Sequence, residues 1–231
     1  GIFSMTKAES KVIDFIKKHI LLFLLIAVTI IAIFLRVCGM DFQSDDFNSF
    51  LNSWWSIIKL NDFTGLATQV GNYNIPYQVI IYLMTLLPLN ALYAYKIVSI
   101  IFDFVLAIST AMLVYSFAKN NRRLKAILTY SAVLLSATVI FNSSFWAQCD
   151  SIYTSFIILA ILFLHKDKPI ASFVFIGIAF AFKLQTVFII PVLLYYWIST
   201  KKISILHFFI IPAVDVIMCL PAIIMGRPFI D

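Results

Sequence analysis

The sequence predicts an all-α, polytopic transmembrane helix bundle. Hydrophobic residues fill 62% of the 231 positions, whereas charged residues make up only 12%, against about 25% in soluble domains. A soluble chain of this length cannot bury so much apolar surface, so lipid is the expected solvent. The net charge of +6 comes from short basic clusters between apolar runs. Such clusters are typical of membrane topology and argue against a nucleic-acid partner.

The positions of the basic clusters predict the orientation of the chain. Lysines between positions 7 and 18 precede the first apolar run, so the N-terminus should be cytoplasmic and the first helix should exit outward. The later clusters at 119–125, 166–168 and 201–202 stay cytoplasmic only if the 75–88 run does not cross. As a helix this run rises about 20 Å, which is short of a hydrocarbon core of about 30 Å. It is therefore predicted to be a juxtamembrane or re-entrant helix on the outer side.

This map gives a single multi-pass transmembrane domain, 5–231, in the plasma membrane, with membrane lipid as a partner. Gly1–Ser4, which precede Met5, are interpreted as a tag remnant. The end of the chain in a predicted outer loop suggests the N-terminal portion of a longer protein. An external segment, 39–90, is expected to carry juxtamembrane helices; we call it the acidic segment. The predicted spans, about seven in number, are 20–37, 91–118, 126–141, 151–164, 170–182, 186–198 and 203–225.

The few carboxylates gather on the predicted external side. Four of them, Asp41, Asp45, Asp46 and Asp62, lie in the acidic segment, and Asp150 lies in the next external loop. Acidic groups would thus face one reaction space at the lipid boundary. That arrangement suits chemistry on a lipid-borne substrate better than it suits a channel.

The acidic segment contains an amphipathic pattern. Its apolar side chains recur at spacings of three and four residues, which predicts a helix along the membrane surface. Asp45 or Asp46 falls at the N-terminus of this helix, where a carboxylate can cap free backbone N–H groups. Two adjacent aspartates exceed what a cap requires, so one of them is available for another role. The pattern consists of Phe47, Phe50, Leu51, Trp54, Trp55 and Ile58.

Three further polar motifs fall on the same predicted face. Asn72–Tyr77 resembles an extended segment that leads into a helix, Trp146–Tyr153 forms a helix–loop–helix corner, and Phe182–Gln185 places a lysine near an amide. Singly, each has a structural explanation: a helix start, a cap by Asp150 or Ser151, or a lysine that reaches toward the interface. Their convergence on one face favours a shared site.

These motifs resemble those of integral-membrane glycosyltransferases with the GT-C fold, and in particular bacterial proteins related to the GPI-anchor mannosyltransferases. That family carries an acidic motif after the first helix, like Ser44–Phe47 here. It then has an Asn-Tyr-x-Pro-Pro-Tyr-like stretch, a Trp-Gly-Gln-x-Asp-Ser-Ile-Tyr-like corner and a Lys-Pro-Gln-like element. Here Ile75, Ala147 and Leu184 replace a proline, a glycine and a proline, and the polar positions are kept. The likeness covers most of residues 12–200.

The resemblance implies transfer of a sugar from a polyprenyl-phosphate-linked donor to an acceptor hydroxyl on a glycan, lipid or protein. The reaction would invert the sugar carbon and take place on the extracytoplasmic face. Asp46 is the predicted general base, with Asp45 in reserve. Lys183 is predicted to clamp the phosphate. The other predicted substrate-binding residues are Tyr73, Tyr77, Trp146, Gln148, Asp150 and Gln185.

Several alternatives stay open. The reaction requires no cofactor, although two neighbouring aspartates are compatible with Mg²⁺ or Mn²⁺. A transporter or lipid flippase without bond chemistry is the main rival, because Asp103 and Asp215 lie within predicted spans. The sequence shows no repeat that would support it. Asp103 could pair with Lys96 or Arg36, stay protonated or line a groove. A non-catalytic membrane scaffold is the third class.

Overall fold

The computed structural model describes residues 5–228, so Gly1–Ser4 and their proposed origin lie outside it. The described chain is all-helical, with α-helices joined by short π-helical and 3₁₀ turns and no strand, which confirms the all-α part of the prediction. The α-helices are α1 Lys7–Val37, α2 Asn52–Asn61, α3 Ile75–Thr85, α4 Ala91–Phe117, α5 Arg122–Leu134, α6 Ala137–Ile140, α7 Asp150–His165, α8 Pro169–Phe182, α9 Ile190–Thr200 and α10 Ile210–Ile224.

Within the described residues, three helices are long and apolar enough to cross a membrane. They are α1, α4 and Ile205–Ile224, in which a 3₁₀ turn leads into α10. Arg122–Leu134 and Ala137–Phe145 would make a fourth if the pair, bent by 51°, forms one broken span. The apolar helices α3, α7, α8 and Leu184–Thr200 are shorter. These helices support a membrane protein, while the predicted number of spans and their orientation stay predictions.

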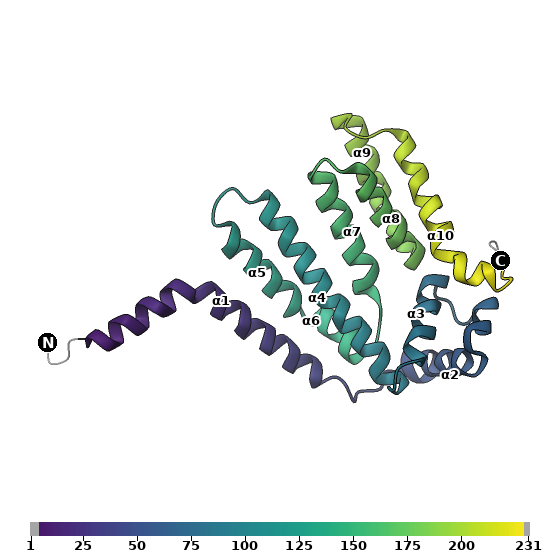
Figure 1. Cartoon of the computed structure of the whole chain (residues 1–231), viewed down its shortest axis with the longest axis horizontal. Helices are drawn as coiled ribbons and strands as arrows, with labels where there is room; N and C mark the ends of the chain where they lie inside the picture. The colour runs from purple at the N-terminus through teal and green to yellow at the C-terminus, as the bar shows by residue number, and fades with distance from the viewer. Residues whose placement is uncertain (1–4, 229–231) are drawn as a thin grey trace.

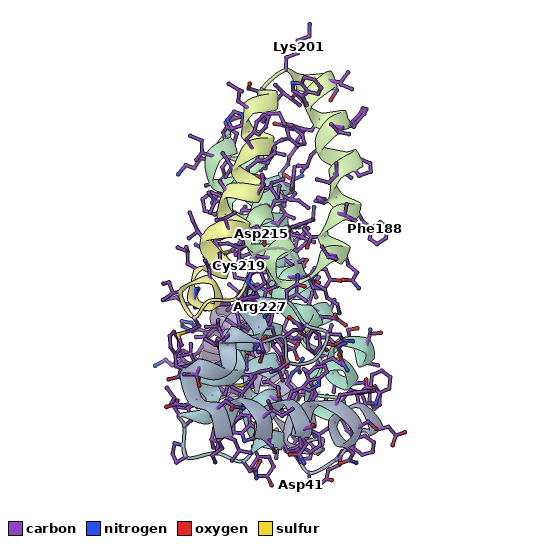
Figure 2. The ribbon with its side chains drawn as sticks, turned by 90° about the vertical axis from the view of Figure 1, so that its right-hand side faces the viewer. Asp41, Phe188, Lys201, Asp215, Cys219 and Arg227 are labelled. Atoms are coloured by element: carbon purple, nitrogen blue, oxygen red, sulfur yellow. The ribbon has the colours of Figure 1, made fainter. Side chains whose placement is uncertain are left out.

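The two ends of the bundle carry different segments. The α4–α5, α7–α8 and α9–α10 connections lie at one end, and α2 and α3 lie at the other, beside the start of α7 and the end of α8 (Figure 1). Lys201 and Asp41 mark these opposite ends in Figure 2. The basic connections and the acidic segment are therefore separated by the length of the bundle.

The acidic segment is attached to the bundle by the apolar face of its first helical stretch. Phe47, Leu51, Trp55 and Ile58 are all buried and pack against α3 and α4. Tyr95 on α4 donates a hydrogen bond to the Leu51 carbonyl, 3.0 Å away. Most of the face expected to lie on the membrane surface thus lies inside the protein. Only Phe50 and Trp54, of the six residues in that pattern, keep substantial exposure.

A buried lysine holds the turn that follows α1. The Lys96 side chain is fully buried, and its Nζ donates to the carbonyl oxygens of Gly39 (2.7 Å), Met40 (3.0 Å) and Phe42 (2.5 Å). An ammonium has three donors, so all of them are used. Of the two cations considered as partners of Asp103, Lys96 is therefore engaged elsewhere.

Asp103 on α4 forms a buried polar hub with residues from three other elements. Arg36 Nε on α1 lies 2.9 Å from Asp103 Oδ2, and both side chains are almost completely buried. Ser143, in the π-helical turn Phe141–Phe145, and Ser151 on α7 donate to the same carboxylate at 2.5 and 2.6 Å. The hub resolves the alternatives left open for Asp103 in favour of a cation partner. Asp215 lies half-buried on α10 (Figure 2).

Gly71 is required by the packing beneath Trp54. Its φ is +75°, and a Cβ there would overlap the Trp54 indole. We predict that Gly71→Ala lowers the free energy of unfolding by about 2–4 kcal/mol, because left-handed backbone strain adds to the clash. Thermal unfolding in detergent measures this. Gly226→Ala is the matched control, since Gly226 has φ +89° and open space around it. Equal losses in the two variants would contradict the role given to Trp54.

Candidate functional site

A cavity of about 630 Å³ opens at the end of the bundle that carries the acidic segment. It lies where the first turns of the segment meet the 72–74 stretch, the corner before α7 and the turn after α8. The cavity thus brings together parts of all four sequence motifs. Its lining residues are Asp46, Phe50, Leu51, Trp54, Asn72, Tyr73, Asn74, Gln148, Phe182, Lys183, Leu184, Gln185, Val187 and Phe188.

A chain of hydrogen bonds fixes the Asp46 carboxylate in the cavity wall. Gln148 Nε2 donates to Asp46 Oδ2 at 2.8 Å, and Tyr73 Oη donates to Gln148 Oε1 at 2.8 Å. A carboxylate only accepts, so the amide NH₂ must face Asp46 and its carbonyl must face the tyrosine. No hydrogen bond within residues 5–228 engages Oδ1 of Asp46. This oxygen is therefore available to a bound substrate.

The Tyr73 hydroxyl stays protonated. Burial raises the pKa of Tyr73 well above its ordinary value, and the neighbouring Cys149 and the carboxylates of Asp150 and Asp46 raise it further. Each of these groups disfavours a phenolate. Tyr73 is consequently a permanent donor that orients Gln148, and it is unsuited to act as a general base.

Lys183 and Asp150 form an ion pair beside the cavity. Lys183 Nζ donates to Asp150 Oδ1, and Asn142 Nδ2 donates to Asp150 Oδ2 at 2.8 Å. Burial by itself lowers the pKa of Lys183, but the hydrogen bond and charge of Asp150 outweigh it and raise that pKa above its usual range. The ammonium also lies 5.5 Å from the centre of the Tyr153 ring. The lysine is thus a fixed positive charge.

The corner that presents Gln148 has an unusual backbone. Ala147 is buried and adopts a left-handed conformation with φ +56°, which costs about 1–2 kcal/mol for a non-glycine residue. Gln148 N donates to the Asn142 carbonyl at 2.8 Å, which closes the turn. Ala147 stands where the family that the sequence resembles carries glycine, and a glycine would adopt this conformation without strain.

The capping role predicted for Asp45 or Asp46 is wrong. Ser44 caps this helical stretch: its Oγ accepts from the Phe47 backbone N–H at 3.1 Å. Ser44 Oγ also donates to the Trp146 carbonyl at 3.3 Å, which joins the cap to the corner. A short side chain before the first turn reaches the free N–H groups, whereas both aspartates already have helical positions. Both carboxylates are therefore exposed and free of a capping role.

The structure separates the predicted site residues into two groups. Asp46, Tyr73, Gln148, Lys183 and Gln185 line the cavity, and Asp150 reaches it through Lys183. The remaining three do not line it. Asp45 and Trp146 border a separate depression, and Tyr77 is fully buried behind Tyr73, with 4.8 Å between the ring centroids.

Other lining residues were not predicted to belong to the site. Asn72 and Asn74 flank Tyr73 and add amide groups to the wall. Because they belong to the same polar motif as Tyr73, the sequence could have assigned them to the site. The exposed apolar side chains of Leu184 and Phe188 form another wall. Phe188 projects sideways from its helix in Figure 2. Hydropathy alone assigns such residues to lipid contact, so no sequence signal singled them out.

No metal-ligand set is apparent in the part of the chain that the structure describes, where no three His, Cys, Asp or Glu side chains gather. The adjacent Asp45 and Asp46 are the only pair that the sequence suggested for Mg²⁺ or Mn²⁺, and no ligand is assigned to them here. Comparison with family models, with curated proteins and with solved structures finds no match to this chain. The function must therefore be inferred from the site.

Proposed function

We propose that the protein is a membrane glycosyltransferase of the GT-C type, which transfers a sugar from a polyprenyl-phosphate donor to an acceptor hydroxyl. The observation that carries this proposal is one cavity that presents both an accessible carboxylate, Asp46, and a fixed ammonium, Lys183. Glycosyl transfer from a phosphate needs these two functions: a base for the acceptor and a positive charge for the leaving group.

Asp46 is the proposed general base. Gln148 holds one oxygen of its carboxylate, which leaves the other to accept the proton of the acceptor hydroxyl. As that proton leaves, the acceptor oxygen forms a bond to the sugar carbon and the bond to the phosphate oxygen breaks. The attack comes from the side opposite the phosphate, so the configuration of the sugar carbon is inverted.

Lys183 is the proposed phosphate ligand. One of its three donors goes to Asp150, so two remain for phosphate oxygens. Charge on the departing phosphate grows in the transition state, and a preorganised ammonium stabilises it there. Phosphate departs without a general acid, which is consistent with a site whose second charged group is a cation.

The position of the cavity supports a lipid-linked donor. Polar groups lie on one side, and the exposed apolar residues Leu184, Val187 and Phe188 lie on another. The polar side would receive the sugar and phosphate, and the apolar side would contact the prenyl chain. In this proposal α2 and α3 are juxtamembrane helices on the extracytoplasmic face, and the protein crosses the plasma membrane several times.

The direct test is transfer by the purified protein in liposomes. Polyprenyl-phosphate hexoses carrying a radiolabelled sugar would be supplied from one side, with acceptor alcohols or glycans. The proposal expects label in the acceptor, with inverted configuration, and release of polyprenyl phosphate. Movement of intact donor across the bilayer without release would indicate a transporter or flippase. Neither cleavage nor movement, with any donor tested, would contradict both.

A variant of Lys183 tests the proposed phosphate ligand. We predict that Lys183→Gln lowers kcat/KM for the donor roughly 10- to 100-fold, because one charge-assisted contact is lost. Lys202→Gln is the matched control: Lys202 also pairs with an aspartate, Asp167, but near the opposite end of the bundle.

The raised pKa of Lys183 predicts how activity depends on pH. The ammonium stays charged at every pH below the ordinary lysine pKa of 10.5, and for some distance above it. The contribution of Lys183 to kcat/KM for the donor is therefore constant from pH 6 to about pH 10, and it is lost only at higher pH. A decline near pH 8 that Lys183→Gln abolishes would contradict this assignment.

A further inference from the structure

A second cavity, of about 700 Å³, lies between α1, α4 and α5, toward the basic end of the bundle. Its walls are mostly apolar, with Leu25 from α1, Ile108 and Met112 from α4, and Ile127 from α5. Thr29 and Tyr130 are also in the wall, and their hydroxyls bond to each other at 2.9 Å, so neither is left unpaired. Both α1 and α4 are long and apolar enough to span a membrane, and in a bilayer that they cross the groove between them would be surrounded by acyl chains.

Cations surround one end of the groove. Arg122 and Lys166 line it directly, and an adjoining depression that shares part of its wall contains Lys17, Lys18 and Arg123. No carboxylate of the described residues lines either hollow. In residues 5–228 none of these five cations takes part in an ion pair. The aspartate that follows Lys166 is already paired with Lys202.

Arg122 is fixed in position at this end. Its Nε donates to the Tyr115 carbonyl at 2.9 Å, and the guanidinium carbon lies 4.2 Å from the centre of the Tyr115 ring. These contacts use one of the five N–H donors and leave the two terminal nitrogens for a ligand. A preorganised guanidinium loses little freedom on binding, and its geometry suits phosphate.

From this geometry we infer a binding site for one anionic phospholipid, with an acyl chain in the groove and the headgroup phosphate against Arg122 and Lys166. Basic pockets between spanning helices bind anionic headgroups, and each cation near the headgroup strengthens the binding. The charge of the site selects an anionic over a zwitterionic lipid, and the apolar wall selects a lipid over free phosphate. The site is distant from the Asp46 cavity and does not depend on the proposed function.

Native mass spectrometry of the detergent-purified, delipidated protein tests the site. Phosphatidylglycerol and phosphatidylcholine with identical acyl chains are the probes, and glycerophosphoglycerol is the headgroup without chains. We expect phosphatidylglycerol to bind at least tenfold more tightly than either. Arg122→Gln/Lys166→Gln should remove that preference. Ala111→Trp, which fills the groove but keeps the cations, should weaken binding of phosphatidylglycerol.

Lys11→Gln/Lys201→Gln is the matched control, because it removes two exposed lysines that line neither hollow. It should keep the preference, and thermal unfolding verifies that each variant is folded. Equal binding of the two lipids, equal loss in the control, or equally tight binding of the headgroup alone would each overturn the inference.

Discussion

Asp46→Asn should lower sugar transfer by about 10²–10⁴-fold, which is the usual contribution of a general base. Asparagine has nearly the same shape, and its carbonyl oxygen can still accept the hydrogen bond from Gln148 Nε2. The variant therefore keeps the wall of the cavity and loses only the ability to take a proton. The loss should appear in kcat, with little change in the KM for the donor.

Asp45→Asn is the control for this variant. The two aspartates are adjacent and exposed, but only Asp46 lines the larger cavity. Turnover of Asp45→Asn should stay close to wild type. Equal activity in wild type and both variants would remove the assignment of the base. A large loss in Asp45→Asn alone would move it to the depression beside Trp146.

Asp103→Leu should be the most destabilising single change in the bundle. It removes the carboxylate that pairs with Arg36 and leaves the guanidinium buried with no opposite charge. Loss of one partner of a buried pair costs about 3–5 kcal/mol. Asp103 also accepts from Ser143 and Ser151, so their hydroxyls lose a partner as well. Thermal unfolding in detergent and resistance to proteolysis both measure the loss.

The double variant Arg36→Met/Asp103→Leu separates charge from packing. If the uncompensated guanidinium causes the loss, removal of both charges should recover most of the stability. If the double variant is as unstable as the sum of the single variants, the hub acts through shape and hydrogen bonds, and the electrostatic account fails. Phe104, whose ring lies 5.8 Å from the guanidinium carbon, also contacts Arg36, so a small residual loss is expected.

The sequence predicts most helices well because long apolar runs mark them clearly. The predicted runs 91–118 and 170–182 differ from α4 and α8 by one residue at one end. The 126–141 run does not form one straight helix. Its residues belong to two helical segments, α5 and Ala137–Phe145, and the chain bends by 51° between them. Hydropathy does not reveal such a bend.

The site is predictable in its members but only partly in its geometry. The sequence predicts that the motifs containing Asp46, Gln148 and Lys183 lie on the same side of the membrane. In the structure these three residues line one cavity. Tyr77 and Trp146 belong to the same motifs, yet one is buried and the other lies outside. Which side of a corner a residue faces depends on the local backbone, such as the left-handed Ala147, and not on spacing.

The identity of the helix cap also depends on detail that the sequence leaves open. Ser44, Asp45 and Asp46 are all good N-cap residues. Helical structure begins at Asp45, two residues before the first apolar residue of the pattern, Phe47, so Ser44 takes the cap position. The start of the helix thus decides whether the two carboxylates cap its backbone or stay free of that role.

The contacts of Lys96 bear on the order in which the protein is assembled. The three carbonyls that it binds lie between the end of α1 and the acidic segment, while Lys96 itself is on α4. During synthesis the ribosome therefore produces Asp46 well before the residue that secures the path leading to it. The acidic segment therefore reaches the conformation described here only after α4 has docked against the turn that follows α1, so the cavity that Asp46 lines forms late in assembly.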